Sequence, residues 1–290
     1  MSAEVRMLRM DFVKMHGLGN DFIIVQNGQA DLPEEKYAEA AQRLCAFHWG
    51  IGADGLVVIG PDPEYDLRMR IFNADGSEAE MCGNALRCVA KYAWEAGVCR
   101  KPRLRIGTIG GLRETTLLTE GDRVTGVRVD MGPPLLKAEK IPVRWPESPV
   151  VYGKLTVAER EFTFAAVSMG NPHCVIEVGQ VSAFPVQQWG PLIETHPLFP
   201  AKTNVEFVTV ADAHRVTIRV WERGVGETLA CGTGACAAAV ACALRGLTGR
   251  RVTVELAGGD LLIDWAEHDG HVYLTGGATL VFTGRMDLDW

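Results

Sequence analysis

The stretch DLRMRIFNADGSEAEMCGNALRCVAKYAWEAG (66–97) has a counterpart in RVTIRVWERGVGETLACGTGACAAAVACALRG (215–246), and the two align without a gap. The offset is 149 residues, which places Cys82 on Cys231. Both stretches begin with an alternating run typical of a strand, pass through a polar turn that contains glycine, and continue into a segment of strong helical propensity. The pair predicts one strand, one turn and one helix in each half of the chain.

Two further matches occur in the same order along the chain. GNDFIIV (19–25) resembles GNPHCVI (170–176), and ADGLVVIG (53–60) can be aligned with TNVEFVTV (203–210). Solenoids repeat about every 20 to 50 residues, and the spacing here is several times larger. The sequence therefore predicts a duplicated domain.

The ends of the two predicted helices carry recognisable signals. Asn84 and Thr233 are residue types that favour the N-cap position, and Gly97 and Gly246 suit the C′ position. The second helix, TGACAAAVACALRG (233–246), is apolar on nearly every side. A helix without a polar face is expected to be buried, here inside a curled sheet.

Most of the remaining chain consists of short strand-like runs with few helices. This pattern predicts an α+β (mixed α/β) fold of two homologous, pseudo-twofold-related domains, each a mixed, mostly antiparallel sheet wrapped around a central helix. The proline-rich segment 130–149 is expected to connect them. We predict an N-terminal domain of residues 1–132, a C-terminal domain of residues 133–276, and a C-terminal strand (277–290) that returns to the first domain. The active site is expected in the cleft between the domains.

Composition excludes several classes of function. The 290-residue chain has a net charge of −7 and no basic run, so neither nucleic acid nor an anionic membrane is an expected partner. The opening stretch MSAEVRMLRMDFVKM lacks the apolar core of a signal peptide, and no later segment is long and apolar enough to span a membrane. We therefore expect a cytoplasmic globular protein.

The eight cysteines are expected to be reduced, because disulfide frameworks are typical of small exported domains. They form no C-x-x-C pair, and none stands with a histidine at zinc-finger spacing. The sequence therefore indicates no metal site, and most of the cysteines are expected to pack as small apolar residues.

Cys82 and Cys231 differ from the others because each stands just before a predicted helix. The N–H groups and dipole of a helix N-terminus favour an anion and lower the pKa of a thiol. A lone cysteine at such a place is usually a packing residue, but two at matched positions of related domains indicate a function. If both face one substrate carbon, one thiolate can remove a proton while the opposite thiol delivers a proton to the other face. This inversion needs no metal or organic cofactor, because helix N–H groups can stabilise the charge that develops.

Five motifs together resemble the diaminopimelate epimerase family over essentially the whole chain. They are KMHGLGNDFIIV (14–25), FNADGSEAEMCGNALRC (72–88), SMGNPHCV (168–175), TNVEFV (203–208) and ERGVGETLACGTGACA (222–237). The resemblance implies a cofactor-independent isomerase that interconverts LL- and meso-2,6-diaminopimelate in lysine and peptidoglycan precursor biosynthesis. It also implies a small-molecule substrate and a homodimer.

The resemblance also implies a role for each matching residue. Cys82 and Cys231 match the two catalytic acid/base cysteines of the family. The positions that match substrate-binding residues are Asn20, Asn73, Gly83, Asn84, Asn171, Asn204, Glu222, Arg223, Gly232 and Thr233. Arg223 is implied to hold the distal carboxylate, and His173 and Glu222 to tune the pKa values of the cysteines. Phe282 lies near a C-terminal aromatic residue that the family associates with dimerisation.

Other functions remain open at this point. A proline racemase-like enzyme would also use two cysteines, although Glu222-Arg223 indicates a second amino-acid head on the substrate. A phenazine-biosynthesis-like isomerase would use a carboxylate base in place of the thiols. The run G-x-G-x-x-A at 232–237, with Glu255 following 21 residues after Gly234, resembles a dinucleotide-binding fingerprint of an oxidoreductase. A binding protein without activity is the last alternative.

Overall fold

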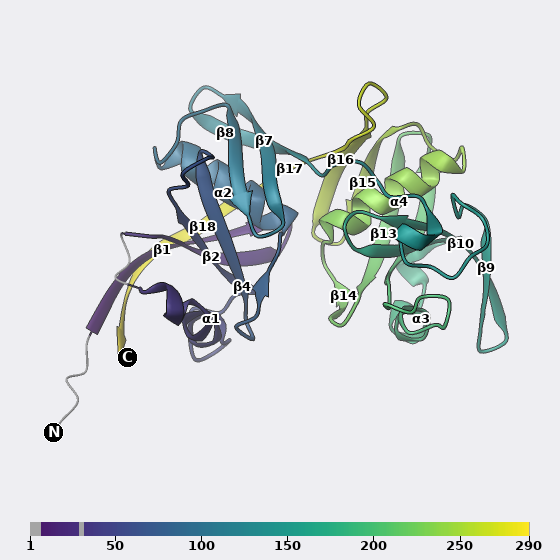
Figure 1. The fold of residues 1–290 in the computed structure, drawn as a ribbon, viewed down its shortest axis with the longest axis horizontal. Coiled ribbons are helices and arrows are strands. Elements are labelled where there is room, and N and C mark those ends of the chain that lie inside the picture. The colour runs from purple at the N-terminus through teal and green to yellow at the C-terminus, as the bar shows by residue number, and fades with distance from the viewer. Residues whose placement is uncertain (1–6, 29–31, 290) are drawn as a thin grey trace. The chain divides into compact units, whose positions relative to one another are not determined.

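The computed structural model describes residues 7–28 and 32–289. The chain divides into two compact units (Figure 1). Unit 1 comprises Met1–Val129 with Gly276–Trp290, and unit 2 comprises Asp130–Thr275.

Unit 1 contains most of the N-terminal half of the chain. Its strands are β1 (Met7–Gly17), β2 (Asn20–Gln26), β3 (Gly55–Gly60), β4 (Leu67–Asn73), β5 (Glu78–Ala79), β6 (Arg103–Thr108), β7 (Gly111–Glu120), β8 (Arg123–Asp130) and β18 (Thr279–Asp289). Its helices are α1 (Tyr37–Cys45) and α2 (Gly83–Glu95), and a short 3-10 helix spans Glu34–Lys36.

Unit 2 repeats this order of elements. Its strands are β9 (Gly153–Val157), β10 (Arg160–Ser168), β11 (Pro172–Glu177), β12 (Asn204–Asp212), β13 (Arg215–Glu222), β14 (Gly226–Thr228), β15 (Arg251–Leu256), β16 (Gly259–Trp265) and β17 (Val272–Gly276). Its helices are α3 (Val186–Glu194) and α4 (Gly232–Leu244), with short 3-10 helices at Ala138–Lys140 and Val181–Ala183.

Strand pairing confirms the predicted duplication. In unit 1, β1 and β2 are antiparallel, β2 and β3 parallel, β3 and β4 antiparallel, and β4 and β6 parallel. In unit 2, β10 and β11, β11 and β12, β12 and β13, and β13 and β15 repeat this series. β18 pairs antiparallel with β1, as β9 does with β10, so a strand from the C-terminus occupies in unit 1 the position of β9 in unit 2. Each sheet is therefore mixed and mostly antiparallel, as predicted.

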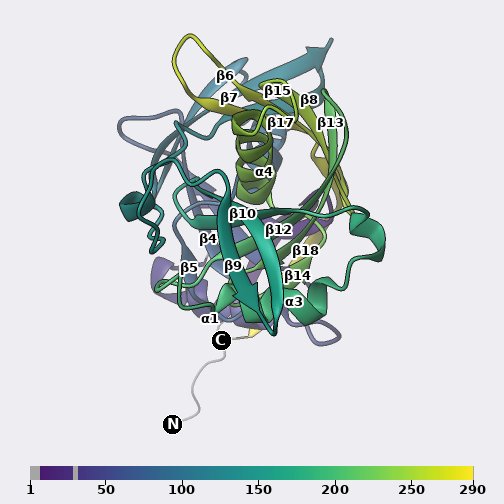
Figure 2. The same ribbon diagram turned by 90° about the vertical axis from the view of Figure 1, so that its right-hand side faces the viewer.

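A central helix lies against the strands of each unit. α4 contacts β10, β11, β12, β13, β15 and β16. Figure 2 shows it with β10, β12, β13 and β15 around it. The residues from Gly234 to Cys242 are buried, which explains why this helix carries no polar face. In unit 1, α2 contacts β1, β2 and β7.

A shorter helix packs on each sheet through a second apolar cluster. α1 contacts β3 and β4, and α3 contacts β12, β13 and β14. Gly190 of α3 lies so close to the sheet that an added Cβ would be 2.5 Å from the ring of Trp221. Each sheet is thus covered by helices on both faces, and the strand ends that carry the predicted site residues are fixed by packing.

The predicted helix starts are wrong by two residues. Cys82 and Cys231 are themselves the N-caps, with extended backbones at φ −142° and −125°, and the helices begin at the following glycines. The predicted helix ends are confirmed, since Gly97 and Gly246 follow the C-caps with φ of +74° and +69°. Asn84 and Thr233 therefore lie in the first helical turn, with their side chains beside the cysteines.

The strand register also corrects one of the internal alignments. Leu56 pairs with Phe72 in unit 1, and Val205 pairs with Trp221 in unit 2. The correct offset for these strands is therefore 149 residues, one fewer than the match of ADGLVVIG with TNVEFVTV implies. As a result Glu206 corresponds to Val57, and not to Leu56.

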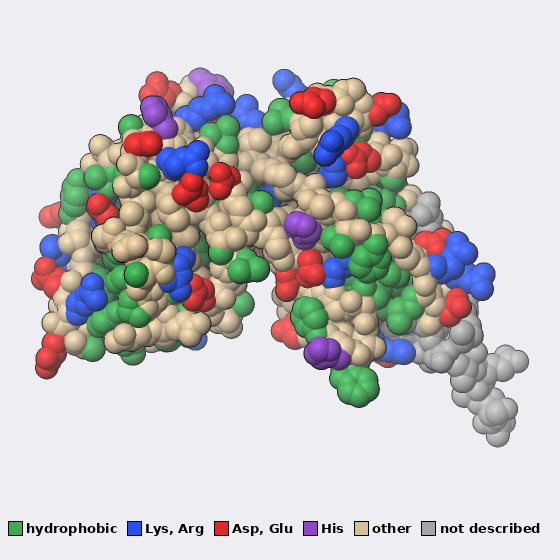
Figure 3. All heavy atoms as spheres, turned by 180° about the vertical axis from the view of Figure 1, so that it is seen from behind, with side chains coloured by type: hydrophobic (Ala, Val, Ile, Leu, Met, Phe, Trp, Pro, Cys, Tyr) green, Lys and Arg blue, Asp and Glu red, His purple; other side chains and the backbone are tan. Residues whose placement is uncertain are grey.

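The surface carries charges of both signs. On the face that Figure 3 shows, Lys and Arg side chains lie among Asp and Glu side chains. Among the described residues, no helix is both long enough and apolar enough to cross a membrane.

Candidate active site

Each unit holds one predicted catalytic cysteine at the N-terminus of its central helix. Cys82 is partly exposed, whereas Cys231 is only 6% exposed. Both are followed by glycine as the first residue of the helix. The first N–H groups of a helix have no partner inside it, so both thiols lie where an anion is favoured.

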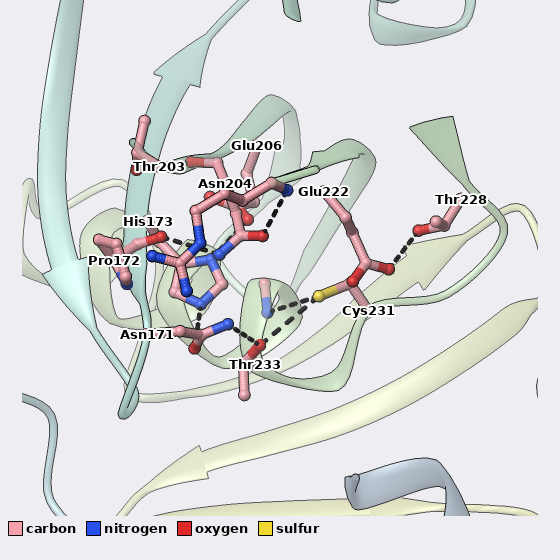
Figure 4. A network of polar contacts seen from close by, with 12 residues as sticks. Asn171, Pro172, His173, Thr203, Asn204, Glu206, Glu222, Thr228, Cys231 and Thr233 are labelled. Atoms are coloured by element: carbon pink, nitrogen blue, oxygen red, sulfur yellow. Dashed lines mark hydrogen bonds and ion pairs between the residues drawn. The ribbon is translucent and has the colours of Figure 1, made fainter. Parts of the chain in front are cut away.

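The polar contacts of Cys231 come from the first turn of α4 (Figure 4). The Gly234 N–H donates to Sγ at 3.4 Å, and the Thr233 hydroxyl lies 3.5 Å from Sγ. Burial raises the pKa of Cys231 well above its usual value, the carboxylates of Glu222 and Glu206 raise it further, and the two hydrogen bonds oppose them. A thiolate at Cys231 therefore depends on the hydrogen bonds and charges that surround it.

A chain of hydrogen bonds continues from Thr233 into the interior. Asn171 Nδ2 donates to the Thr233 hydroxyl at 3.3 Å, and Asn171 Oδ1 lies 2.9 Å from Nε2 of His173. Nδ1 of His173 lies 2.7 Å from Oε1 of Glu206, and both side chains are fully buried. Figure 4 shows this series of side chains from Cys231 to Glu206. The parallel pairing of β11 and β12 places His173 beside Asn204 and brings Glu206 within reach.

The other predicted residues of unit 2 form a second group near Cys231. Asn204 Nδ2 donates to the Pro172 carbonyl at 2.9 Å, and its Oδ1 accepts the Arg223 N–H at 2.9 Å. The exposed Arg223 guanidinium donates to the Ala201 carbonyl at 3.0 Å. Glu222 accepts a 2.6 Å hydrogen bond from the Thr228 hydroxyl. The polar atoms of Asn204 hold the loop from which Arg223 extends.

The surroundings of Cys82 in unit 1 are arranged differently. Asn20 Oδ1 lies 3.7 Å from Sγ of Cys82 and accepts a 3.0 Å hydrogen bond from Asn84 Nδ2. Asn20 Nδ2 donates to Asp54 at 2.7 Å. Because an ionised carboxylate only accepts hydrogen bonds, Asp54 fixes the amide of Asn20 with its oxygen toward the thiol. Asn20 therefore offers Cys82 an acceptor, whereas the Gly234 N–H offers Cys231 a donor.

Two more residues complete the site of unit 1. Arg87 is fully buried and donates to Asn84 Oδ1 at 2.8 Å, which fixes the amide of Asn84 as Asp54 fixes that of Asn20. Asn73 ends β4, where its Nδ2 donates to the Ser77 hydroxyl at 2.9 Å. Asn73 stands at the position that Glu222 occupies at the end of β13.

In unit 1, the predicted residues that lie around Cys82 are Asn20, Gly83 and Asn84. In unit 2, those around Cys231 are Asn171, Glu222, Gly232 and Thr233. Asn204 and Arg223 contact each other in the loop that follows Glu222. Sequence analysis missed Asp54, Arg87 and Glu206. The signal for Glu206 was present, because a lone carboxylate in the apolar run VEFV is unusual in a buried strand. Phe282 is 44% exposed, and its ring packs edge-on against Phe12 with centroids 5.9 Å apart.

The remaining cysteines fit a packing role. The structure describes all eight and joins none of them in a disulfide. Burial raises the pKa of Cys88 and of Cys242 to about 12, so these thiols stay protonated at neutral pH. Within the described part of the chain, no group of three or more His, Cys, Asp or Glu residues is arranged to hold a metal ion.

The sequence matches one family over most of its length. The family model described as diaminopimelate epimerase matches residues 12–137 and 165–281. A diaminopimelate epimerase from Pelotomaculum thermopropionicum is 54% identical over 276 residues, which is 95% of this chain and 98% of that protein. One from Methanococcus maripaludis is 50% identical over 279 residues, covering 96% and 100% of the two chains.

Solved structures with low sequence identity share the fold. A hydroxyproline epimerase from Agrobacterium vitis superposes with a TM-score of 0.70 at 16% identity, covering 99% of this chain and 93% of that one. A phenazine biosynthesis protein from Bacillus anthracis superposes with a TM-score of 0.69 at 16% identity, covering 97% and 99%. At this level of identity the likeness concerns the fold alone.

The dinucleotide-binding interpretation of residues 232–237 does not agree with the local fold. That fingerprint requires a buried strand that runs directly into the first glycine. Here the preceding strand, β14, is three residues long and ends at Thr228, and Cys231 intervenes as the N-cap of α4. Gly234 is required for a different reason, because an added Cβ would lie 2.8 Å from Oε1 of Glu206.

Proposed function

The chain belongs to the diaminopimelate epimerase family, and on that premise we propose that it interconverts LL- and meso-2,6-diaminopimelate with Cys82 and Cys231 as the two acid/base groups. The observation that carries the proposal is the matched position of the two thiols, each the N-cap of the central helix in one of two homologous units. The reaction would supply a precursor of lysine and of peptidoglycan.

The mechanism is a two-base inversion at one carbon. One cysteine, as a thiolate, removes the proton from the substrate α-carbon, and the other, as a thiol, gives its proton to the opposite face. The C–H pair of electrons remains on the substrate as a carbanion until the new C–H bond forms. N–H groups at the starts of α2 and α4 stabilise the carboxylate at the reacting centre, whose negative charge grows in the transition state. The proposal requires both helix N-termini to meet at one substrate, in a cleft between the units.

The hydrogen bonds around the thiols support opposite starting states. Cys82 has an acceptor in Asn20, which suits a thiol that donates its proton. Cys231 accepts from the Gly234 N–H, and the adjacent Thr233 hydroxyl can donate to it, which suits a thiolate. In this assignment Cys231 is the base and Cys82 the acid for one isomer, and the roles exchange for the other.

The remaining polar residues bind the ends of the substrate. Diaminopimelate carries two carboxylates and two ammonium groups, which require amide donors and acceptors, a guanidinium and a carboxylate. Arg223 is exposed, the Asn204 side chain holds its backbone, and the Ala201 carbonyl accepts from its guanidinium, so Arg223 is suited to the distal carboxylate. Glu222 is suited to an ammonium group and, as its effect on Cys231 indicates, to tuning the pKa of the thiol.

Three further assignments accompany this function. We propose that residues 1–132 with 277–290 and residues 133–276 are the two catalytic domains. We propose a cytoplasmic homodimer whose contact surface includes Phe282, because the neighbouring Leu280 and Val281 also expose apolar side chains. No metal or organic cofactor takes part in the proposed steps.

The test is an epimerisation assay with LL-diaminopimelate, with L-proline and trans-4-hydroxy-L-proline as alternative substrates. The expected result is conversion of LL-diaminopimelate alone, and its loss in both Cys82→Ala and Cys231→Ala. Conversion of proline or hydroxyproline in preference to diaminopimelate would instead favour the reaction that the structurally similar hydroxyproline epimerase is named for. Binding of diaminopimelate without any inversion would support a binding protein.

A further inference from the structure

The buried pair of His173 and Glu206 occurs in only one of the two homologous units. The strand registers make Phe22 the counterpart of His173, because each pairs with the first residue of the next parallel strand, Gly55 or Asn204. The same registers make Val57 the counterpart of Glu206. Val57 pairs with Ile24 and Ile71. Glu206 pairs with Val175 and Val220, at the equivalent positions of the equivalent strands. The fold therefore forms in unit 1 with an apolar pair at these positions.

The pair in unit 2 costs stability. Both side chains are fully buried, and Oε2 of Glu206 has no hydrogen-bond partner among the described residues. A buried carboxylate oxygen without a partner destabilises a fold, because nothing replaces the hydrogen bonds that it makes to water in the unfolded chain. A feature that the homologous unit lacks, and that destabilises the unit that has it, is expected to serve function.

The pair is connected to Cys231 by hydrogen bonds. Its contacts lead from Nε2 of His173 through the amide of Asn171 and the hydroxyl of Thr233 to Sγ. In unit 1 the amide of Asn20, beside Cys82, is instead fixed by Asp54. The amide of Asn171 contacts the side chains of Thr233 and His173, neither of which is a carboxylate, so both orientations of the amide are open to it.

We propose that Glu206 is a positioning residue which, by holding Nδ1–H of His173, makes the pair a proton reservoir matched to Cys231. This inference rests on the proposed function, because it assigns Cys231 a thiolate state in catalysis.

The hydrogen bonds have two consistent arrangements. When Nε2 carries a proton it donates to Asn171 Oδ1, Asn171 Nδ2 donates to Thr233, and the Thr233 hydroxyl donates to a thiolate. When Nε2 carries none, the amide is reversed, the Thr233 hydroxyl donates to Asn171, and the Cys231 S–H donates to Thr233. In the first arrangement the charged groups are the Glu206 carboxylate, the His173 imidazolium and the Cys231 thiolate. In the second arrangement the Glu206 carboxylate is the charged group. The net charge is −1 in both, so one proton moves from sulfur to the pair without changing the charge of the interior.

Other ionisable groups near the pair bear on this equilibrium. Burial raises the pKa of Glu206, the charge and hydrogen bond of His173 lower it, and Glu222 on β13 raises it. Cys174 on β11 also interacts with Glu206, but burial keeps that thiol protonated. Glu222 and Glu206 both raise the pKa of Cys231. Through its field alone, Glu206 therefore disfavours the thiolate at Cys231, and the proposal requires its effect through His173 to be larger.

The opposite signs of these effects give the test. In Glu206→Gln the neutral amide cannot stabilise an imidazolium, so the proposal predicts a smaller thiolate fraction at Cys231. The whole protein is treated with iodoacetamide at pH 7.5 and the alkylated peptides are quantified by mass spectrometry, with Cys82 as the internal reference. We expect alkylation of Cys231, relative to Cys82, to slow by about tenfold, and kcat for diaminopimelate to fall by a similar factor with KM changed less. Alkylation at an equal or faster rate would overturn the proposal.

Two variants sharpen the result. Glu255→Gln makes the same chemical change in unit 2 at an ion pair with Arg215, away from the network, and is expected to leave both rates unchanged. Thr233→Val removes the hydroxyl that connects Asn171 to Cys231 and leaves His173 and Glu206 in place. It should therefore slow the alkylation of Cys231 as Glu206→Gln does, and adding Glu206→Gln to it should have little further effect on that rate. Additive losses in the double variant would contradict the proposal. Wild-type alkylation in Thr233→Val alone would contradict it even if Glu206→Gln fails to fold. A wild-type protein without epimerase activity would refute the proposed function and leave the alkylation comparison intact.

Discussion

Replacing Gly234 with alanine is expected to destabilise unit 2, although alanine is the better helix former. Gly234 lies in the first turn of α4, where the exchange would gain up to about 1 kcal/mol from helix propensity alone. The new Cβ, however, would lie 2.8 Å from Oε1 of Glu206 and 3.3 Å from Sγ of Cys231. Glu206 cannot move away easily, because His173 holds the same oxygen at 2.7 Å.

The size of the effect follows from these two terms. Overpacking of a buried site costs about 1 to 3 kcal/mol, and the helix-propensity gain of up to about 1 kcal/mol offsets part of it, so the net loss should be up to about 2 kcal/mol. Such a loss corresponds to a fall in Tm of a few degrees for a unit of this size. Urea unfolding and a thermal scan of the full chain would measure it. An increase in stability near the full helix-propensity gain would refute the close contact between Glu206 and α4.

The homologous unit supplies the control for this experiment. Unit 1 has Ala85 where unit 2 has Gly234, together with Phe22 and Val57 in place of His173 and Glu206. The triple variant His173→Phe, Glu206→Val, Gly234→Ala copies that apolar solution. We expect it to recover at least the stability of the wild type while epimerisation is lost. A triple variant less stable than Gly234→Ala would show that the two units pack differently at this point.

Two further outcomes concern the carboxylates behind the thiols. Asp54→Asn should let the Asn20 amide turn over, which removes the hydrogen-bond acceptor from Cys82. The loss of one hydrogen bond of about 1.4 kcal/mol should lower kcat by about tenfold. The control is Asp66→Asn, which changes an ion pair with Lys101 elsewhere in unit 1, and an equal fall of kcat in both variants would contradict the prediction. Because burial raises the pKa of Glu206, the fold favours its protonated form, so its contribution to stability is present below the unfolded pKa of about 4.3 and is lost as pH rises toward the folded value. The stability of Glu206→Gln relative to the wild type should therefore increase from pH 4 toward neutrality in urea unfolding, and a difference independent of pH would contradict the assignment.

The duplicated fold could be predicted from the sequence because its signals are local and occur twice. The alternating run at the start of each stretch, the C-G pair and the glycine at the end of each helix all act within one element. Two copies in the same order, at offsets of 149 and 151 residues, then made weak signals specific. The helix starts were misjudged because Asn84 and Thr233 are better N-caps by residue type, whereas the extended backbone at each cysteine takes that position and leaves the amide and hydroxyl for contacts beside the thiol.

The network behind Cys231 could not be predicted in the same way. Glu206 and His173 are 33 residues apart and meet only because β11 and β12 are parallel neighbours. The alignment of the two halves was also one residue out of register there, which set Glu206 beside Leu56. Only the strand pairing of the folded units identifies Phe22 and Val57 as the apolar counterparts and so makes the pair stand out.

The most direct test of the two-thiol mechanism is to follow hydrogen exchange during one turnover. LL-diaminopimelate is converted in deuterated water, and the product and the remaining substrate are analysed early in the reaction. Because one cysteine removes the proton and the other delivers a different one, early meso product should carry solvent deuterium at the inverted carbon while the remaining LL substrate carries none. Equal labelling of product and substrate from the outset would mean that a single base acts on both faces, and would contradict the account.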